Sequence, residues 1–523
     1  MRMRGILAFA LLLAGCPSAA RAGSPANRSR SAAPASRPAG EVQRAEDHVV
    51  TLKVAYQDFD ERTPWARRPP SMRTGTATVV EGRFLLTSFY IVKDATLIRV
   101  HKRGLPQSAV ARVRHWDPFM NLALLEVTEA GFTDDLVPVP ISDANPRNGE
   151  LKTARWKDRQ LEIADLRVQK ADVQLARSGG QEHVFLVGTT DLAEGGWAEP
   201  VFRGRELAGM TTSQDGRTAY VVPAGILAAY LAQARTPATY TGFAGWEARY
   251  QVNDDPALAA WLGQEGSPRG IVLRKVPWGA TGRGVLQPRD ILLSLDGHEI
   301  DSSGFYEHPR FGLLDLDQIV IDGHRPGDVV PARILRQGRV MDVQVPLRRY
   351  VDSDRLVPRF RVAGAPPYVI AGGLVFRELS MPYLETWGDK WHKKAPVPLV
   401  VRLDESAEDQ QPGHRRIVFL QGVIPIPYNV GYQELRDLEV REVNGRTVDS
   451  LPALDEALRH PVDGFHRVRF APNGSVAEIV LDADGMEAAT RFVLANYRIP
   501  RAVVLPQDAP GDLGPACGGG LAP

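Results

Sequence analysis

The stretch Gly195-Gly196-Trp197-Ala198-Glu199-Pro200 places a glycine-rich turn directly before two short apolar segments, Val201-Phe202 and Leu207-Ala208-Gly209-Met210. The polar residues Gly204-Arg205-Glu206 separate these segments. Glycine permits the positive φ of a tight turn, and two apolar runs around a polar turn are typical of a β-hairpin. We therefore predict a β-hairpin that is entered through a glycine-rich turn containing Trp197.

The residues before this turn continue the same pattern. Short apolar runs that include β-branched residues are separated by Gly, Pro and Asp, and they cover 48–56, 76–80, 83–88, 96–101, 110–114 and 122–127. Runs of this length and spacing indicate an all-β barrel or sandwich. One helix is predicted, over 223–234.

Two further units follow, at 239–349 and 367–500. The first contains predicted strands over 270–275 and 291–295, and a hairpin of 330–335 with 339–345 around Gln337-Gly338. The second contains predicted strands near 374–376, 417–421 and 438–444, and a helix near 451–459. Both units share a strand that ends in an Asx-Gly pair, Asp296-Gly297 in one and Asn444-Gly445 in the other. Such a pair favours a tight hairpin turn.

The first 22 residues resemble an export signal, with arginines before a short apolar core. Leu13-Ala14-Gly15-Cys16 is typical of a lipoprotein signal, in which Cys16 is lipidated, whereas Ala20-Arg21-Ala22 fits ordinary signal cleavage. We favour the lipoprotein interpretation, and with it a membrane-anchored protein of the bacterial periplasm. Residues 23–41 are predicted to be a disordered tether, because they contain almost no large apolar side chain. Residues 501–523 are predicted to be a disordered tail, because the chain becomes rich in proline and glycine after Pro500.

Composition excludes several classes of function. The chain has 523 residues, enough for three or four domains at about 150 residues each. A net charge of +1 without a basic run gives no basis for nucleic-acid binding. The two cysteines, Cys16 and Cys517, predict no structural disulfide and no cysteine protease. Single histidines, among them His101, His183 and His298, show no metal-ligand spacing, and no cofactor is expected.

Several motifs resemble the HtrA/Deg serine proteases, in that family's order. They are Gly75-Thr76-Ala77, the stretch at 85–92, Asp117 with the stretch at 121–127, the glycine-rich turn, Ala371-Gly372-Gly373-Leu374-Val375-Phe376, Pro382-Tyr383-Leu384 and Asn429-Val430-Gly431-Tyr432. The resemblance covers 42–500 and is closest to the plant-type Deg arrangement. It implies a mainly β chain, with a trypsin-like double β-barrel (42–235) followed by two PDZ-like α+β domains (239–349 and 367–500, the second degenerate).

The resemblance also locates the family's catalytic triad. The general-base histidine corresponds to Tyr90, the orienting aspartate to Asn121 and the nucleophilic serine to Trp197. A serine needs an imidazole to accept its proton, and the imidazole needs a carboxylate. Indole is not a nucleophile, and a phenol with a pKa near 10 is a poor base at neutral pH. The carboxylate of Glu199 beside an oxyanion would also oppose the reaction.

A rearranged serine-protease site built from other residues is the alternative. Ser178-Gly179-Gly180 contains a serine beside glycines, but no proline and paired strand follow it. His115 or His183 would have to act as its base. We expect His115 to lie in a surface loop that leads to Asn121, and we expect Ser178 not to act as a nucleophile.

The PDZ-like units retain features of a peptide-binding site. In that family an extended peptide adds to a sheet edge, and backbone amides of a glycine-containing loop hold its carboxylate. The corresponding loop is Phe243-Ala244-Gly245-Trp246, although Phe243 and Trp246 could instead be core residues. In the third unit residues 372–376 are the nearest equivalent, and a structural role is the better interpretation there.

Three functions follow from these observations. The favoured one is an exported pseudoprotease that binds peptides or unfolded proteins as a scaffold, chaperone or regulator. The second is an active endopeptidase of envelope protein quality control with rearranged catalytic residues. The third is a structural subunit of a homo-oligomer, as the resemblance implies.

Overall fold

The structure, a computed structural model, describes residues 45–142, 150–176, 180–362, 364–406, 409, 415–472 and 476–506. The predicted export signal with Cys16, the predicted tether, Ser178 and Cys517 lie outside these residues. Among the helices that the structure does describe, none is both long enough and apolar enough to cross a membrane.

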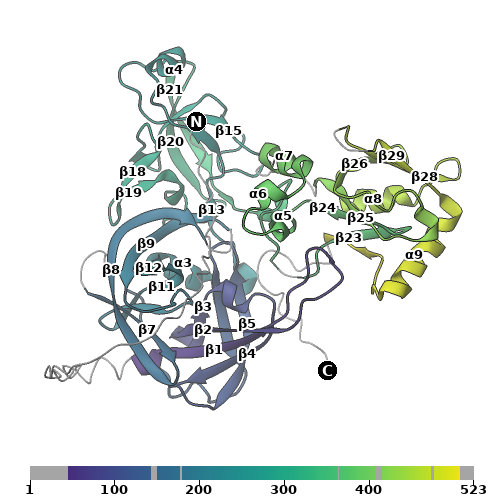
Figure 1. The fold of residues 1–523 in the computed structure, drawn as a ribbon. Helices are drawn as coiled ribbons and strands as arrows, with labels where there is room; N and C mark the ends of the chain where they lie inside the picture. The colour runs from purple at the N-terminus through teal and green to yellow at the C-terminus, as the bar shows by residue number, and fades with distance from the viewer. Residues whose placement is uncertain are drawn as a thin grey trace, which may run out of the picture.

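The N-terminal half forms two closed, six-stranded antiparallel barrels (Figure 1), which confirms the predicted trypsin-like double barrel. The first has the order β1-β2-β3-β6-β5-β4, from β1 (Val49–Tyr56), β2 (Ser71–Val80), β3 (Phe84–Thr87), β4 (Ala95–Lys102), β5 (Ser108–Asp117) and β6 (Leu122–Val127). The second has the order β10-β11-β12-β9-β8-β7, from β7 (Leu151–Lys157), β8 (Gln160–Leu175), β9 (Glu182–Thr190), β10 (Pro200–Arg203), β11 (Glu206–Asp215) and β12 (Thr218–Pro223). The glycine-rich turn enters the hairpin β10–β11, as predicted.

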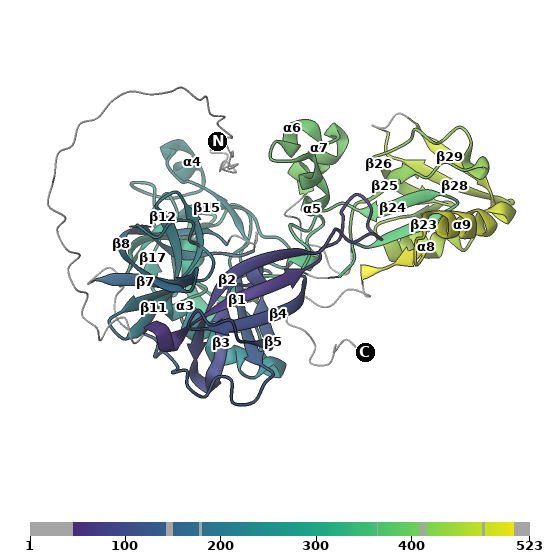
Figure 2. The same cartoon turned by 60° about the horizontal axis from the view of Figure 1, so that its bottom comes forward.

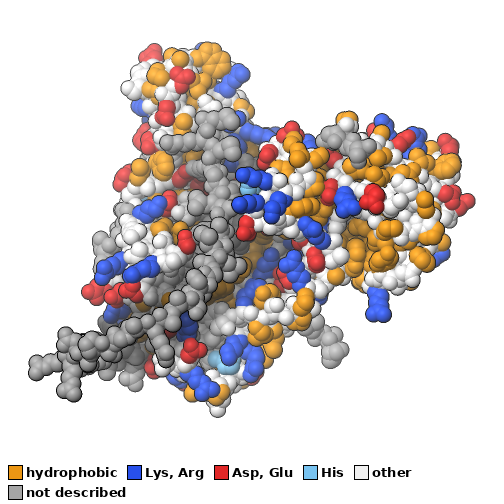
Figure 3. Space-filling model, in the orientation of Figure 1, with side chains coloured by type: hydrophobic (Ala, Val, Ile, Leu, Met, Phe, Trp, Pro, Cys, Tyr) orange, Lys and Arg blue, Asp and Glu red, His pale blue; other side chains and the backbone are white. Residues whose placement is uncertain are grey.

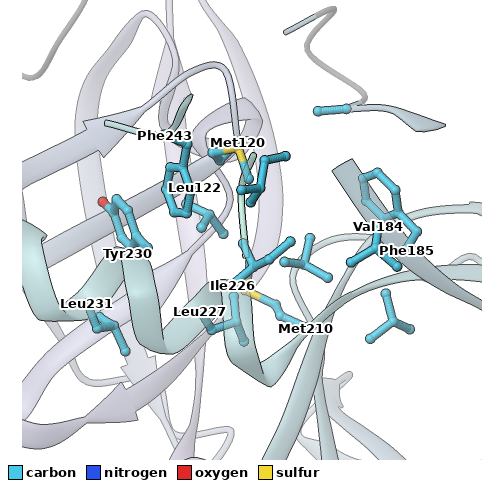
Figure 4. Packing of buried hydrophobic residues seen from close by; sticks show 14 of the residues in the cluster. Met120, Leu122, Val184, Phe185, Met210, Ile226, Leu227, Tyr230, Leu231 and Phe243 are labelled. Carbon is cyan, nitrogen blue, oxygen red and sulfur yellow. The ribbon is translucent and has the colours of Figure 1, made fainter. Parts of the chain in front are cut away.

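The predicted helix is α3 (Ala224–Ala234), which follows the second barrel and covers its core. Ile226, Leu227, Tyr230 and Leu231 are buried on it. Figure 4 shows Ile226 and Leu227 close to Met210 of the second barrel, and Leu122 of the first barrel belongs to the same buried cluster. One continuous apolar cluster therefore joins both barrels, and α3 fixes their relative position.

The second unit is built on a sheet with the order β14-β15-β16-β20-β21, and β17 pairs with β16. Its elements are β13 (Ala244–Gly245), β14 (Arg249–Gln251), α4 (Pro256–Trp261), β15 (Ile271–Lys275), β16 (Ile291–Leu295), β17 (His298–Glu299), β18 (Phe305–His308), β19 (Gly312–Asp315), β20 (Val329–Arg336), β21 (Arg339–Pro346) and β22 (Arg348–Arg349). The Asp296-Gly297 pair has φ of 48° and 76° and joins β16 to β17, so the predicted turn is confirmed.

The third unit has the sheet order β29-β28-β26-β25-β24-β23-β30. Its strands are β23 (Tyr368–Ala371), β24 (Leu374–Glu378), β25 (Val418–Val423), β26 (Leu438–Val443), β27 (Arg446–Thr447), β28 (Phe465–Phe470), β29 (Glu478–Asp482) and β30 (Val503–Val504). Its helices are α5 (Met381–Leu384), α6 (Trp391–Lys394), α7 (Val397–Ser406), α8 (Leu451–Leu458) and α9 (Ala483–Tyr497). Figure 2 shows this unit standing beside the barrels.

Two features of the third unit were not predicted. The 15-residue helix α9 begins after Asp482, whose carboxylate accepts a hydrogen bond from Gly485 N at 3.1 Å. The sheet also continues past Pro500, because Val503 pairs with Val369 of β23. The prediction that the ordered chain ends at residue 500 was therefore wrong, because a short strand of two valines completes the sheet there.

The loop between β1 and β2 reaches from the first barrel to the third unit, as both ribbon views show (Figures 1 and 2). Its Trp65 ring lies edge-on to Tyr368, with centroids 5.8 Å apart. Its Glu61 carboxylate forms ion pairs with Arg377 at 2.9 Å and with Arg361 at 3.1 Å. Burial alone would raise the pKa of Glu61, but the two guanidinium groups lower it. A buried, charged junction therefore holds the third unit against the barrel.

Candidate active site

The structure brings Tyr90, Asn121 and Trp197 together between the two barrels. Tyr90 lies on the short helix α2 (Phe89–Val92), Asn121 precedes β6, and Trp197 lies in the turn before β10. The rings of Tyr90 and Trp197 have centroids 6.0 Å apart at an interplanar angle of 40°. Tyr90 and Trp197, which are far apart in the chain, therefore meet at one site.

Asn121 supports the segment that carries Tyr90. Its side-chain oxygen accepts a hydrogen bond from Tyr90 N at 2.9 Å, and its backbone oxygen accepts one from Phe89 N at 3.1 Å. Asn121 adopts a φ of 55°, a left-handed conformation that asparagine tolerates better than most residues. Its buried Nδ2 finds no hydrogen-bond partner among the described residues. The side chain holds the backbone but has no carboxylate to orient a base.

The glycine-rich turn is fixed by close contacts. Gly196 has a φ of 93°, and a Cβ there would lie 2.6 Å from the backbone of Ser213 and Gln214, so only glycine fits. The carbonyl oxygen of Trp197 accepts a hydrogen bond from Thr76 N of β2 at 2.8 Å. The turn therefore joins the second barrel to the first.

The carboxylate of Glu199 accepts hydrogen bonds from backbone amides of this turn. Its Oε2 accepts hydrogen bonds from Gly196 N and Trp197 N, both at 2.9 Å, and from the hydroxyl of Thr211. Glu199 is 0% exposed. Its Oε1 lies 3.8 Å from Arg155 Nη1, and Arg155 also binds the carbonyls of Ala193 and Glu194. The turn therefore binds an internal anion, and the Trp197 amide is not free for a substrate oxyanion.

The histidines proposed for a rearranged site are buried. His115 lies in β5 at 2% exposure, so the expectation of a surface loop was wrong. A β-bulge between Val113 and His115 turns its ring into the core, where Nδ1 lies 3.2 Å from the hydroxyl of Tyr230. Burial lowers the pKa of His115 to about 4.

His183 is fully buried in β9, where its ring lies 4.2 Å from that of Phe185 between centroids. Burial lowers its pKa to about 4, and the hydrogen bond to the Val184 carbonyl does not offset this. His101 is also buried, in β4, and His298 lies in β17. In the described part of the chain, no group of three His, Cys, Asp or Glu residues could hold a metal ion.

Phe243, Ala244, Gly245 and Trp246 lie at the boundary between α3 and the second unit. Phe243, Ala244 and Trp246 are 4%, 0% and 2% exposed, and Figure 4 shows Phe243 beside Met120 and Leu122. The carbonyl of Ala244 accepts a hydrogen bond from Gln181, and that of Gly245 accepts one from Thr281 at 2.6 Å. The loop therefore packs against the second barrel, while the following strand β14 is the end strand of its sheet.

The corresponding residues of the third unit lie in a different setting. Gly372 and Gly373 form the turn between β23 and β24. Gly372 N donates a hydrogen bond to Thr490 of α9 at 2.8 Å, and Asn429 donates one to Gly372 O at 2.9 Å. Strand β24 pairs with β23 on one side and β25 on the other, so it offers no free edge for a peptide.

Two features of the site were not predicted from the sequence. One is the burial of the Glu199 side chain against the glycine-rich turn, which depends on its contacts with Thr211 and Arg155 in other strands. The other is Arg73, whose guanidinium carbon lies 3.7 Å from the Tyr56 ring centroid and 5.0 Å from that of Tyr90. No local motif marks either contact, because each joins residues from different strands.

Comparison with known proteins found several proteases that are similar to this chain. The chain is 22% identical to protease Do-like 4, mitochondrial, of Arabidopsis thaliana over 466 residues, covering 88% of this chain and 85% of the relative. It is 24% identical to protease Do-like 2, chloroplastic, of the same plant, covering 86% and 74%. A PDZ domain family model matches residues 357–504. Over most of its length the chain is therefore similar to proteases of the HtrA/Deg type.

Solved structures of proteases were also found. The HtrA-type protease AlgW with decapeptide shares 19% identity, covering 60% of this chain and 99% of that chain, with a TM-score of 0.45. The serine endoprotease from Yersinia pestis shares 16% identity, covering 60% and 97%, with a TM-score of 0.39. The PDZ match of this chain falls on the third unit, which the sequence motifs had marked as the degenerate one.

Proposed function

We propose that this chain is a pseudoprotease of the HtrA/Deg type, which binds peptides or unfolded proteins without cleaving them. The observation that carries the proposal is that Tyr90, Asn121 and Trp197, which the resemblance assigns to the three triad positions, lie together at one site. None of the three supplies a nucleophile, a base of suitable pKa or a carboxylate. The hydrogen bond from Trp197 N to Glu199 supports the proposal, because this amide is then not available to stabilise the oxyanion of a substrate.

Peptide binding is proposed to remain in the PDZ-like units. The end strand β14 offers a sheet edge to which an extended peptide could add, next to the loop that contains Gly245. The protein would then serve as a scaffold, chaperone or regulator. We further propose that it is exported to the bacterial periplasm, where lipidation of Cys16 anchors it to the membrane.

Two alternatives are distinguished by the same assay. Fluorescein-labelled casein incubated with the purified full-length protein should release no fluorescent fragments, in contrast to an active HtrA protease run in parallel. Release of fragments that disappears in Ser178→Ala would replace the proposal by the rearranged endopeptidase. If neither casein nor peptides bind at all, while the mass in solution is that of a homo-oligomer, the structural subunit becomes the better account.

A further inference from the structure

Arg73 lies beside the proposed triad positions, with its guanidinium close to two tyrosine rings. The guanidinium carbon is 3.7 Å from the ring centroid of Tyr56 and 5.0 Å from that of Tyr90. Nη1 donates a hydrogen bond to the backbone carbonyl of Tyr90. These contacts come from β1, β2 and α2, so three elements fix the orientation of one side chain.

Within the described residues, the remaining donors of Arg73 have no hydrogen-bond partner. Of its five N–H groups only one on Nη1 is used, and within the described residues the guanidinium forms no ion pair. Asp94 is near enough for Arg73 to lower its pKa, although burial raises the pKa of Asp94 by more. Arg73 is half-buried, so its charge is partly shielded from water without being neutralised by contact.

Aromatic side chains extend from Arg73 across the site. Tyr90 contacts Arg73 on one side and faces Trp197 on the other, with ring centroids 6.0 Å apart. Tyr56, Tyr90 and Trp197 are each half-buried. A fixed cation beside partly exposed rings matches a ligand that carries a carboxylate next to an apolar group. Figure 3 shows basic and acidic side chains gathered along the junction between the barrels and the third unit, on the side visible there.

We propose that this site binds acidic peptide segments. The carboxylate of an aspartate or glutamate side chain accepts hydrogen bonds from Arg73, and the neighbouring apolar residue of the peptide stacks on Tyr90 and Trp197. The positions that hold the triad in active relatives thus form a recognition surface. The inference rests on the proposed function in one respect only, namely that the bound peptide is not cut.

The test compares two labelled peptides, fluorescein-Ala-Phe-Asp-Ala-Ala-amide and its Asn counterpart. The terminal amide removes the carboxylate that a PDZ loop would bind, so any preference for Asp comes from the side chain. Fluorescence anisotropy at low ionic strength gives the two dissociation constants with the full-length protein. We expect the Asp peptide to bind roughly fivefold more tightly or better, which is typical of a partly exposed charge pair.

Variants assign that preference to Arg73. Arg73→Gln should bring the Asp-to-Asn ratio close to one, and Arg73→Lys should keep part of it because the charge remains without the planar stacking. Trp197→Ala should weaken both peptides equally. Arg99→Gln is the matched control, since Arg99 is an exposed arginine of the same barrel that bonds Ser108, and it should leave the ratio unchanged.

Two results would overturn the inference: equal binding of both peptides by the unmodified protein, or an Asp preference that persists in Arg73→Gln. The first comparison needs no variant, so misfolding of Arg73→Gln cannot hide the answer. Mass spectrometry of the peptides after incubation separates this inference from the proposed function. Intact peptide without an Asp preference contradicts the inference and leaves the pseudoprotease standing, whereas cleaved peptide contradicts the pseudoprotease.

Discussion

The side-chain oxygen of Asn121 lies 2.9 Å from the backbone nitrogen of Tyr90 and accepts its hydrogen bond. This contact holds α2 in place, and the proposed function gives neither side chain a catalytic role. An aspartate at position 121 would make the same bond and would also supply a charge. The local architecture of a protease site is therefore retained, and this allows its chemistry to be rebuilt by substitution.

Rebuilding the triad alone should not restore hydrolysis. The triple variant Tyr90→His, Asn121→Asp, Trp197→Ser should react with a fluorophosphonate at least tenfold more slowly than the same variant with Glu199→Gly. The reason is that Glu199 Oε2 takes the amide of residue 197, and loss of one oxyanion donor costs about 100-fold or more in rate. Labelling rates by intact mass measure the difference. Equal rates would show that Glu199 does not block the turn.

Stability should fall in acid because of His115. Its pKa is about 4 in the fold and about 6.5 in the unfolded chain, so the neutral ring contributes stability above pH 6.5 that is lost as the pH falls toward 4. Replacement by Phe keeps an aromatic ring against Tyr240 and removes the titration. The urea midpoint should drop less between pH 7 and pH 5 in His115→Phe than in the unmodified protein. An identical drop would place the acid sensitivity elsewhere.

The junction at Glu61 should be weakened by removing its charge. Glu61→Gln leaves the buried Arg377 without its anionic partner, which typically costs about 3 kcal/mol or more. Amide hydrogen exchange should increase in the 57–70 loop and in β23 and β24, while the second barrel stays protected. Glu434→Gln, at an exposed position of the third unit, is the control. Unchanged exchange would mean that the apolar contact of Trp65 carries the junction.

Gly245→Asp separates a structural from a binding role of its loop. A Cβ at this buried glycine would lie 3.2 Å from Tyr350 Cβ, so the carboxylate should lower the melting temperature by several degrees. Gly225→Asp is the control, because no atom lies within 4 Å of a Cβ there. Loss of peptide binding at an unchanged melting temperature and unchanged oligomeric mass would instead favour the predicted carboxylate-binding role.

Much of the fold could be predicted from local patterns, but the side-chain contacts of the site could not. Asx-Gly turns such as Asp296-Gly297 fix hairpins through the backbone conformation of two residues, which the sequence displays directly. The resemblance to HtrA/Deg proteases located Tyr90, Asn121 and Trp197. By contrast, His115 was misplaced because a β-bulge determines which side of β5 it faces.

Longer-range contacts explain the other differences. Arg155 and Glu199 form an ion pair although they are 44 residues apart in the chain (199 − 155 = 44). Only the closure of the second barrel brings them together. The helix α9 did have a local signal, since Met486, Ala489 and Val493 repeat at helical spacing behind the capping Asp482. Its apolar face was overlooked, whereas the Arg155 contact had no sequence signal.

The proposed lack of catalysis is tested most directly by intact-mass spectrometry after the purified protein is incubated with a fluorophosphonate. An active HtrA protease serves as the positive control. The account predicts that the mass of this protein is unchanged, because residue 197 is tryptophan and the amide beneath it is bound to Glu199. A gain of one phosphonyl group on any serine, at a rate comparable to the control, would contradict the account.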